Sequence, residues 1–296
     1  MDSRGIRKFN IKQVLSDYLE LTKPPIMFLL LITASGGMFL AQNGVPDLWL
    51  MLAVWLGGAT ASGGASALNH YWDRDIDLLM ARTSDRPVAA KRISGLAAVV
   101  FGVTLNVISM AVLLLWVNWL AAVLTLGATL FYVVIYTMWL KRSTPQNIVI
   151  GGAPGAIPPV VGWVAITGSF DLSALFLFSI VFFWTPAHFW ALSLMIEKDY
   201  EKVKIPMLSV VAPIDYTVLS IFLYTVIVVS LTVVFAFTGV TGIVYLISAV
   251  VLGVVFLYFA WQLKKTQSLI KARHQYLYSL LYLMVLFCSF MVDSLI

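Results

Sequence analysis

Charged residues are scarce in this chain of 296 residues: Lys and Arg number 19, Asp and Glu number 14, and together they make 11% of the sequence. A soluble domain of this length carries roughly a quarter charged residues. Because 61% of the residues are apolar, so few charges cannot cover the apolar surface in water. The composition excludes a soluble globular protein and predicts an integral membrane protein whose surface is largely covered by lipid.

Cysteine is nearly absent, since Cys288 is the single one. One cysteine cannot form an intrachain disulfide. The residue lies in an apolar run, and we interpret it as a small buried or lipid-facing side chain. Residues 1–21 are polar and mixed in charge, without the apolar stretch of a cleavable signal peptide, so none is expected.

Long apolar runs, by contrast, occur throughout the chain. A bilayer core of about 30 Å requires about 20 apolar residues per helix, and nine runs of this kind are present. They cover residues 25–42, 48–70, 94–116, 118–140, 147–167, 172–195, 214–237, 241–263 and 275–294. The predicted fold is therefore all-α, with nine transmembrane helices. A cytoplasmic segment of residues 1–23 would precede a single membrane domain of residues 24–296.

The basic residues fall on one side of this predicted membrane domain. They precede the first span or follow the second, fourth, sixth and eighth: Arg4, Arg7, Lys8, Lys12, Lys23, Arg74, Arg82, Arg86, Lys91, Arg92, Lys141, Arg142, Lys198, Lys202, Lys204, Lys264, Lys265, Lys271 and Arg273. The other connections contain none. The positive-inside rule predicts a cytoplasmic N-terminus, an outside C-terminus and a functional site that faces the cytoplasm from the cell membrane. Because the basic residues follow this distribution, the net charge of +5 does not indicate binding to nucleic acid.

Three polar residues after the second run share a helical spacing. Asn69, Asp73 and Asp77 stand at i, i+4 and i+8, so successive side chains are offset by only about 40° and project from one helix face. Oxygen ligands of this kind suit a hard cation such as Mg²⁺. Burying them at a membrane boundary without a function is costly, which favours a catalytic metal site over a solvated helix end. Asp75 lies off this stripe, and a structural role suits it equally well.

Basic residues near the stripe indicate what a metal ion would bind there. Arg82 and Arg86 follow directly, and their planar guanidinium groups match phosphate oxygens. Carboxylates and arginines are compatible at one site if a metal ion bridges the protein to a diphosphate. Lys141 and Arg142 follow the fourth run and are either anchors at the membrane surface or further diphosphate ligands.

A second polar cluster follows the sixth run. Glu197 and Glu201 form an i, i+4 pair, whereas Asp199 projects elsewhere. The pattern leaves a second metal ligand at Asp199 and an ion-paired loop equally open. His188 lies about ten residues inside the run, and an ionisable residue at that depth is a functional candidate. A buried structural histidine is the alternative.

The fifth run is rich in glycine and proline, with the segment Gly151-Gly152-Ala153-Pro154-Gly155-Ala156-Ile157-Pro158-Pro159. Proline interrupts a membrane helix, and glycine allows two helix backbones to approach closely. We therefore expect this span to be kinked and closely packed.

Together these motifs resemble the UbiA superfamily of intramembrane prenyltransferases and, within it, the heme O synthase branch. The superfamily's first motif, an Asn followed by Asp at the fourth and eighth places, matches Asn69, Asp73 and Asp77. The branch extends it with matches to Arg82-Thr83 and Arg86-Pro87. Further similarity is carried by Tyr136-Thr137, Leu140-Lys141-Arg142, Asn147, residues 151–159, Gly162-Trp163, Trp184-Thr185-Pro186, His188-Phe189, Asp199-Tyr200 and Ile205-Pro206-Met207-Leu208. The similarity spans roughly residues 20 to 210 and is weak beyond 215.

The resemblance implies nine helices around a central cavity, with cytoplasmic loops over a diphosphate. Farnesyl diphosphate would be the donor, the vinyl group of protoheme IX (heme b) the acceptor, and heme O the product after addition of water. The site would comprise catalytic Mg²⁺ ligands at Asn69, Asp73 and Asp77, a further metal ligand at Asp199, diphosphate ligands at Arg82, Arg86, Lys141 and Arg142, and a heme-binding residue at His188.

The sequence departs from this branch at two places. Pro25 follows Thr22-Lys23-Pro24 where the family often has arginine. The contact that this arginine would make with an anion is therefore missing. The second Asp-rich motif of quinone-type enzymes is reduced to Asp199 with acidic neighbours, which leaves the number of metal ions open.

Two other functions are compatible with parts of the pattern. A prenyltransferase acting on 4-hydroxybenzoate or another quinone precursor shares the first motif, but residues 188–208 favour the heme branch. A membrane transporter also buries Asp and Arg, yet the outer half of the predicted membrane domain is almost free of ionisable residues. An association with a heme A synthase or a terminal oxidase is compatible with the resemblance, although no residue supports it.

Overall fold

The computed structural model describes residues 11–296. Arg4, Arg7 and Lys8, and the beginning of the segment 1–23 that the sequence assigns to the cytoplasm, lie outside the described residues. Over residues 11–296 the chain contains helices and no strands. Nine helical segments of this range are long and apolar enough to cross a membrane. The predicted fold class, an all-α protein with nine membrane helices, is confirmed.

The elements follow one another as a series of long helices joined by short turns. In chain order they are α1 (Ile11–Leu21), α2 (Pro24–Gln42), α3 (Leu48–Trp72), α4 (Arg74–Leu79), α5 (Gly95–Trp116), α6 (Trp119–Leu130), the π-helix η1 (Phe131–Leu140), α7 (Lys141–Ser143), α8 (Asn147–Gly151), the 3₁₀-helix η2 (Ala153–Ala156), α9 (Ile157–Thr167), α10 (Leu172–Met195), α11 (Glu197–Lys202), α12 (Leu208–Val211), α13 (Ile214–Ala236), α14 (Ile243–Thr266) and α15 (Leu269–Asp293).

Most predicted spans agree with these helices to within a few residues, but the ninth does not. Helix α15 begins at Leu269 instead of residue 275, and its first turns contain Lys271 and Arg273. Hydropathy marks only the apolar part of a helix. Long basic side chains at a helix end bury their methylene stems and still keep their charges in water, so the helix extends beyond the apolar run.

Polar side chains define where several spans begin. Each accepts a hydrogen bond from a backbone amide of the first helical turn, which would otherwise lack a partner. These N-cap residues are Asp47 before α3, Ser94 before α5, Asn118 before α6, Asp171 before α10 and Ser268 before α15. The short junction at residues 116–119 is therefore a true helix boundary, as the sequence predicts.

The Gly- and Pro-rich fifth span is interrupted, as predicted. It consists of α8, a 3₁₀ turn and α9, with Pro154 at the start of the 3₁₀ turn. It is also closely packed, because Gly162 of α9 lies against the backbone carbonyl of Ala34, and Gly37 of α2 lies against that of Pro159. Helices α2 and α9 consequently meet with no side chain between their backbones.

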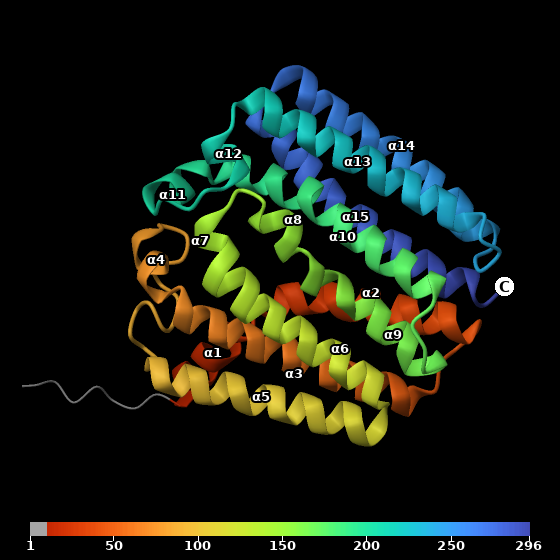
Figure 1. Ribbon diagram of the computed structural model, residues 1–296, viewed down its shortest axis with the longest axis horizontal. Helices are drawn as coiled ribbons and strands as arrows, with labels where there is room; N and C mark the ends of the chain where they lie inside the picture. Colours follow the sequence, from red (N-terminus) through yellow and green to blue (C-terminus); the bar gives the residue numbers. More distant parts are fainter. Residues whose placement is uncertain (1–10) are drawn as a thin grey trace, which may run out of the picture.

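The helices close into one bundle, in which consecutive spans are mostly neighbours. Helix α3 packs against α5, α10 against α13, and α14 against both α13 and α15. Helix α15 also packs against α10 and α2, which brings the last span beside the first. Figure 1 shows that the short elements α4, α7, α11 and α12 gather at one end of the bundle, opposite the C-terminus. The polar connections therefore share one end of the protein.

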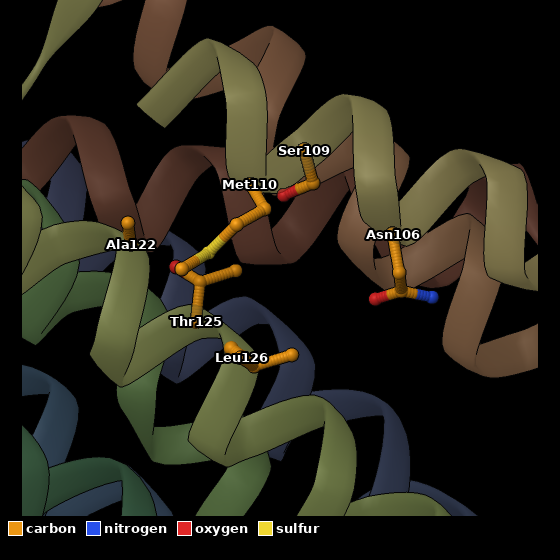
Figure 2. A pocket seen from close by; sticks show the side chains of 6 residues that line it. All are labelled: Asn106, Ser109, Met110, Ala122, Thr125 and Leu126. Carbon is orange, nitrogen blue, oxygen red and sulfur yellow. The ribbon is translucent and has the colours of Figure 1, made fainter. Parts of the chain in front are cut away.

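One void lies within the membrane-spanning part of the bundle, between α5 and α6 (Figure 2). It is lined by Asn106, Ser109, Met110, Ala122, Thr125 and Leu126. Its volume of about 10 Å³ is close to the minimum for one water molecule. Ser109 donates a hydrogen bond to the carbonyl of Gly57, and the Asn106 amide donates to that of Gly102. This void is a packing feature and is too small for a substrate.

The close approach of α2 and α9 predicts the effect of adding one methyl group. Gly162→Ala places a Cβ against the Ala34 carbonyl, and overpacking of this kind lowers the free energy of unfolding by about 1–3 kcal/mol. Gly127→Ala in α6 is the control, because a Cβ there meets no atom within 4 Å. Thermal unfolding in detergent should show a lower Tm for Gly162→Ala only. Equal Tm values for both variants would contradict the close packing.

Candidate active site

The acidic stripe lies where α3 passes into α4, at the end of the bundle that carries the short elements. Asn69 is in the last turn of α3, Asp73 is at the junction and Asp77 is in α4. The Asp73 amide donates to the Asn69 carbonyl (2.9 Å), and the Asp77 amide donates to the Asp73 carbonyl (2.8 Å). Helical spacing continues through the junction, so the three side chains share a face. All three are buried, with Asp73 fully inaccessible.

Asp73 is the centre of this site, and its two carboxylate oxygens differ. Its Oδ2 accepts hydrogen bonds from the Asn69 amide (2.7 Å) and from the Lys141 ammonium. Its Oδ1 is buried, accepts no hydrogen bond from residues 11–296 and lies 3.5 Å from Nη2 of Arg142. A buried carboxylate oxygen without a hydrogen bond is costly. A hard cation is a suitable ligand for it, so the donor set fits the Mg²⁺ that the sequence predicts.

Asp77 is held by the loop that follows α4. Nη1 of Arg86 lies 2.8 Å from both carboxylate oxygens of Asp77, and the Thr83 hydroxyl donates to the Asp77 carbonyl (3.0 Å). The loop therefore folds back over the stripe, which brings Arg86 to the acids as the sequence suggested. Arg82 is exposed and forms no hydrogen bond or ion pair within the described range, so its guanidinium remains accessible to an anion.

Lys141 and Arg142 reach the stripe from a distant part of the chain, through the π-helix η1. A π-helix is rare and is frequently found at functional sites. Here it ends at Leu140, directly before Lys141, which forms an ion pair with Asp73. It also places the Thr137 hydroxyl 3.2 Å from the Asn69 amide. The role of Thr137 was not evident from spacing, because 68 residues separate it from Asn69.

Arg142 is engaged by the one acidic residue that lies off the stripe. Its guanidinium forms two hydrogen bonds with Asp75, at 2.7 and 2.8 Å, and a third with the Trp72 carbonyl at 3.2 Å. These bonds to Arg142 lower the pKa of Asp75. Between the two roles that the sequence left open for Asp75, the geometry favours the structural one, since the side chain orients Arg142 beside Asp73.

Lys23, which the sequence placed on the cytoplasmic side and in the Thr22-Lys23-Pro24 motif, also contacts the stripe. Its ammonium donates to Oδ1 of Asn69 at 3.1 Å. Its backbone is left-handed, with φ 51° and ψ 61°, although Pro24 follows. A residue before proline normally adopts an extended conformation, and a left-handed non-glycine residue costs on the order of 1–3 kcal/mol. Burial, together with the positive charges of Arg86 and Lys141, lowers the pKa of Lys23 to about 7.

The second polar cluster, which contains Glu197, Asp199 and Glu201, does not join the acidic stripe. Within residues 11–296, no three His, Cys, Asp or Glu side chains lie close enough to hold one metal ion. Asp199 is half-buried in α11, whereas Glu197 and Glu201 are exposed. The neighbouring Tyr200 is buried in a cluster that includes Ile76 and Met80, and burial raises its pKa. Tyr200 therefore anchors α11 in an apolar cluster that also includes Ile76 of α4, while Asp199 is not brought into a cluster with Asp73 and Asp77.

His188 lies within α10, away from the acidic stripe. Its ring stacks between Trp184 (4.3 Å) and Tyr276 (4.8 Å), and Nδ1 is 2.6 Å from the Ser279 hydroxyl. The same hydroxyl is placed to donate to the Tyr276 carbonyl, and this arrangement assigns Nδ1 of His188 as the donor to Ser279. Nε2 then carries a lone pair, and it has no hydrogen-bond partner among the described residues.

Comparison with protein families identifies the class to which this site belongs. The sequence model of the UbiA prenyltransferase family matches residues 30–288 of this chain. The chain belongs to the UbiA prenyltransferase family. A protoheme IX farnesyltransferase from Gloeothece citriformis (strain PCC 7424) is similar to it, with 47% identity over 292 residues, which cover 98% of this chain and 90% of that protein.

Two solved structures have the same fold as this UbiA chain. A digeranylgeranylglyceryl phosphate synthase aligns with a TM-score of 0.79 at 19% identity, and the match covers 95% of this chain and 98% of that one. A UbiA homolog from Archaeoglobus fulgidus bound to GPP and Mg²⁺ aligns with a TM-score of 0.63 at 16% identity, covering 93% and 99%. At these identities the likeness concerns the fold.

The two neighbouring carboxylates Asp73 and Asp75 provide a matched test of metal binding. Asp73→Asn should weaken the binding of Mn²⁺, used as a spectroscopic substitute for Mg²⁺ and measured without diphosphate, by roughly ten-fold or more, because a charged oxygen ligand is lost. Asp75→Asn should leave the affinity within about two-fold, because Asp75 pairs only with Arg142. Electron paramagnetic resonance of free Mn²⁺ measures both affinities. Equal affinity for the wild-type protein and Asp73→Asn would exclude Asp73 as a ligand.

Proposed function

We infer that this UbiA prenyltransferase transfers the farnesyl group of farnesyl diphosphate to a vinyl group of protoheme IX (heme b). Addition of water then gives heme O, and diphosphate is released. The observation that carries this inference is the 47% identity to a protoheme IX farnesyltransferase along nearly the whole of both chains. It favours heme over 4-hydroxybenzoate as the acceptor, and the family match favours an enzyme over a transporter.

Mg²⁺ is the proposed cofactor, with Asn69, Asp73 and Asp77 as its protein ligands and Asp199 as a candidate for a further one. The buried Oδ1 of Asp73, which accepts no hydrogen bond within residues 11–296, supports this set, as does the Mg²⁺ bound with GPP in the Archaeoglobus fulgidus homolog. When bound, the ion supplies positive charge that stabilises the departing diphosphate. The rest of the proposed chemistry depends on the basic side chains.

Arg82, Arg86, Lys141 and Arg142 are the proposed diphosphate ligands. The bond between C1 of the farnesyl group and the bridging oxygen breaks, and the electron pair leaves with the diphosphate. Fixed positive charges stabilise this developing anion without reorganisation of solvent. In the structure, Lys141 and Arg86 pair with Asp73 and Asp77. These ion pairs hold both cations close to the site before substrate binds.

The farnesyl carbon is then attacked by the vinyl π electrons, which form the new C–C bond. Water adds to the resulting cation on the porphyrin side and loses a proton, so the product contains one farnesyl group and one water more than heme b, less the proton. Premature capture of the allylic cation by water must be prevented, which requires a dry site.

His188 is proposed to bind heme. Its Nε2 lone pair is not used by any described residue, and the rings of Trp184 and Tyr276 hold the imidazole by stacking on its two sides. Neutral imidazole with one nitrogen fixed by a hydrogen bond is a common arrangement for a metal ligand, since the bond sets the tautomer and the ring orientation. The heme iron would be the atom bound.

The proposed location is the cell membrane, with the site facing the cytoplasm. Its support is the distribution of charge: the short elements that carry the stripe and most basic residues gather at one end of the bundle (Figure 1), and such loops remain inside. One membrane domain over residues 24–296 agrees with the closed bundle. An association with a heme A synthase or a terminal oxidase stays a prediction.

Purified protein should convert heme b in the presence of farnesyl diphosphate and Mg²⁺. Mass spectrometry of the porphyrin is expected to show the mass of heme b plus one farnesyl group and one hydroxyl, and a chelator should abolish the product. Prenylated 4-hydroxybenzoate in a parallel reaction, with no heme product, would instead establish the quinone-type activity. The absence of both products from folded protein would refute the prenyltransferase assignment.

His188→Ala should alter the absorbance spectrum of bound heme, because one axial ligand is lost. His274→Ala is the matched control, since His274 is exposed at the start of α15 and is not proposed to meet heme. Spectra recorded at saturating heme should differ from that of the wild-type protein only for His188→Ala. An unchanged spectrum in that variant would remove the ligand role.

A further inference from the structure

A cavity of about 300 Å³ lies beside the acidic stripe, and Arg86 is the one residue of its lining that the mechanism above uses. It is lined by Glu20, Lys23, Pro24, Pro25, Ile26, His70 and Arg86. Its volume is at the lower end of the range for small-ligand pockets. The stripe residues Asn69, Asp73 and Asp77 do not line it. The cavity therefore has basic walls without the proposed metal ligands.

His70 has an environment that is unusual for a buried imidazole. Its side chain is 2% exposed, and neither Nδ1 nor Nε2 has a hydrogen-bond partner within residues 11–296. A buried polar group without a partner is destabilising. Because His70 is one of the residues that line the cavity, a ligand bound there can supply the missing partner.

Lys23, on the same cavity, has no salt-bridge partner in the described part of the chain. Its hydrogen bond goes to the neutral amide oxygen of Asn69, and it forms no ion pair with the described residues 11–296. Glu20 is the one acidic residue of the lining, and it is paired with Arg92 at 3.3 Å. Arg86 already pairs with Asp77. The side-chain nitrogen of Lys23 is thus without a salt-bridge partner among residues 11–296 and lines the same cavity as the imidazole of His70.

We propose that His70 and Lys23 bind an oxyanion in this cavity, and that His70 is a further substrate-binding residue of the enzyme. This proposal rests on the proposed function for the identity of the substrates. The lining residues Pro24, Pro25 and Ile26 are exposed at the start of the first span. The cavity is therefore accessible to the anionic end of an amphiphile whose apolar body stays in the bilayer.

Both substrates provide an oxyanion of this kind. Farnesyl diphosphate carries an outer phosphate, and heme b carries two propionate carboxylates. Arg86 borders both the cavity and the acidic stripe, so an anion bound at His70 lies next to the proposed diphosphate site in either case. If the anion is the phosphate, loss of His70 weakens the binding of diphosphate. If it is the propionate, loss of His70 weakens the binding of heme b.

Two binding titrations on the purified full-length protein distinguish the sources and do not depend on turnover. The first measures the affinity for inorganic diphosphate with Mg²⁺ by calorimetry. The second measures the affinities for heme b and for its dimethyl ester, which lacks the carboxylates, by absorbance. The variants are His70→Ala, His70→Gln, which retains a hydrogen-bond donor, and His274→Ala as the matched control at an exposed histidine. Thermal unfolding confirms that each variant is folded.

His70→Ala is expected to weaken one ligand by about ten-fold or more, the effect of losing one hydrogen bond to a charged group. His70→Gln should retain most of the affinity, and His274→Ala all of it. Weaker diphosphate binding assigns the cavity to the phosphate. Weaker heme b binding, down to the affinity of the ester, assigns it to the carboxylate.

Unchanged affinity for both ligands in His70→Ala would overturn the proposal, and so would an equal loss in His70→Gln and His70→Ala, because the imidazole would then serve only packing. Binding by the wild-type protein without formation of heme O would instead refute the proposed function and leave the oxyanion site standing. The two failures are therefore distinguishable.

Discussion

The contact between Asp73 and Lys141 is the interaction on which the candidate site depends. It joins the α3–α4 junction to the end of η1, two segments that are distant in sequence and carry most of the polar residues discussed above. A carboxylate buried without a partner is strongly destabilising, whereas a paired one is tolerated. Asn69 and Arg142 complete the surroundings of the same carboxylate. The ion pair therefore fixes the orientation of α3 relative to η1, because Asp73 and Lys141 must stay in contact.

The bilayer accounts for the position of this polar cluster at one end of the bundle. Ionisable groups are costly in lipid, so the spans keep them at their ends and pack against one another through apolar and small residues. The contact of Gly162 with the Ala34 backbone shows how closely the spans approach. A rigid frame of this kind can hold charged loops over a site, and fixed charges are what a reaction with a departing diphosphate requires.

Local patterns predicted a large part of this arrangement. The i, i+4, i+8 spacing of Asn69, Asp73 and Asp77 placed three side chains on one face, and the backbone hydrogen bonds through the junction maintain that spacing. Arg86 was identified because it is close in sequence to the acids that it pairs with. The predicted start of the ninth span, residue 275, was too late, because hydropathy detects only the apolar residues and the helix already begins at Leu269. The roles of Asp199 and His188 stay predictions.

The sequence by itself determined the nine spans, the segregation of charge to one end and the acidic stripe, because each of these depends on composition or on a spacing within one helix. Only the tertiary structure decided which distant groups meet the stripe. Lys23 and Thr137 give no periodic signal, since their positions depend on a left-handed backbone before Pro24 and on a π-helix. The cavity that His70 lines is formed by separate parts of the chain. Contacts between residues distant in sequence form only when the helices pack against one another, so no local sequence pattern predicts them.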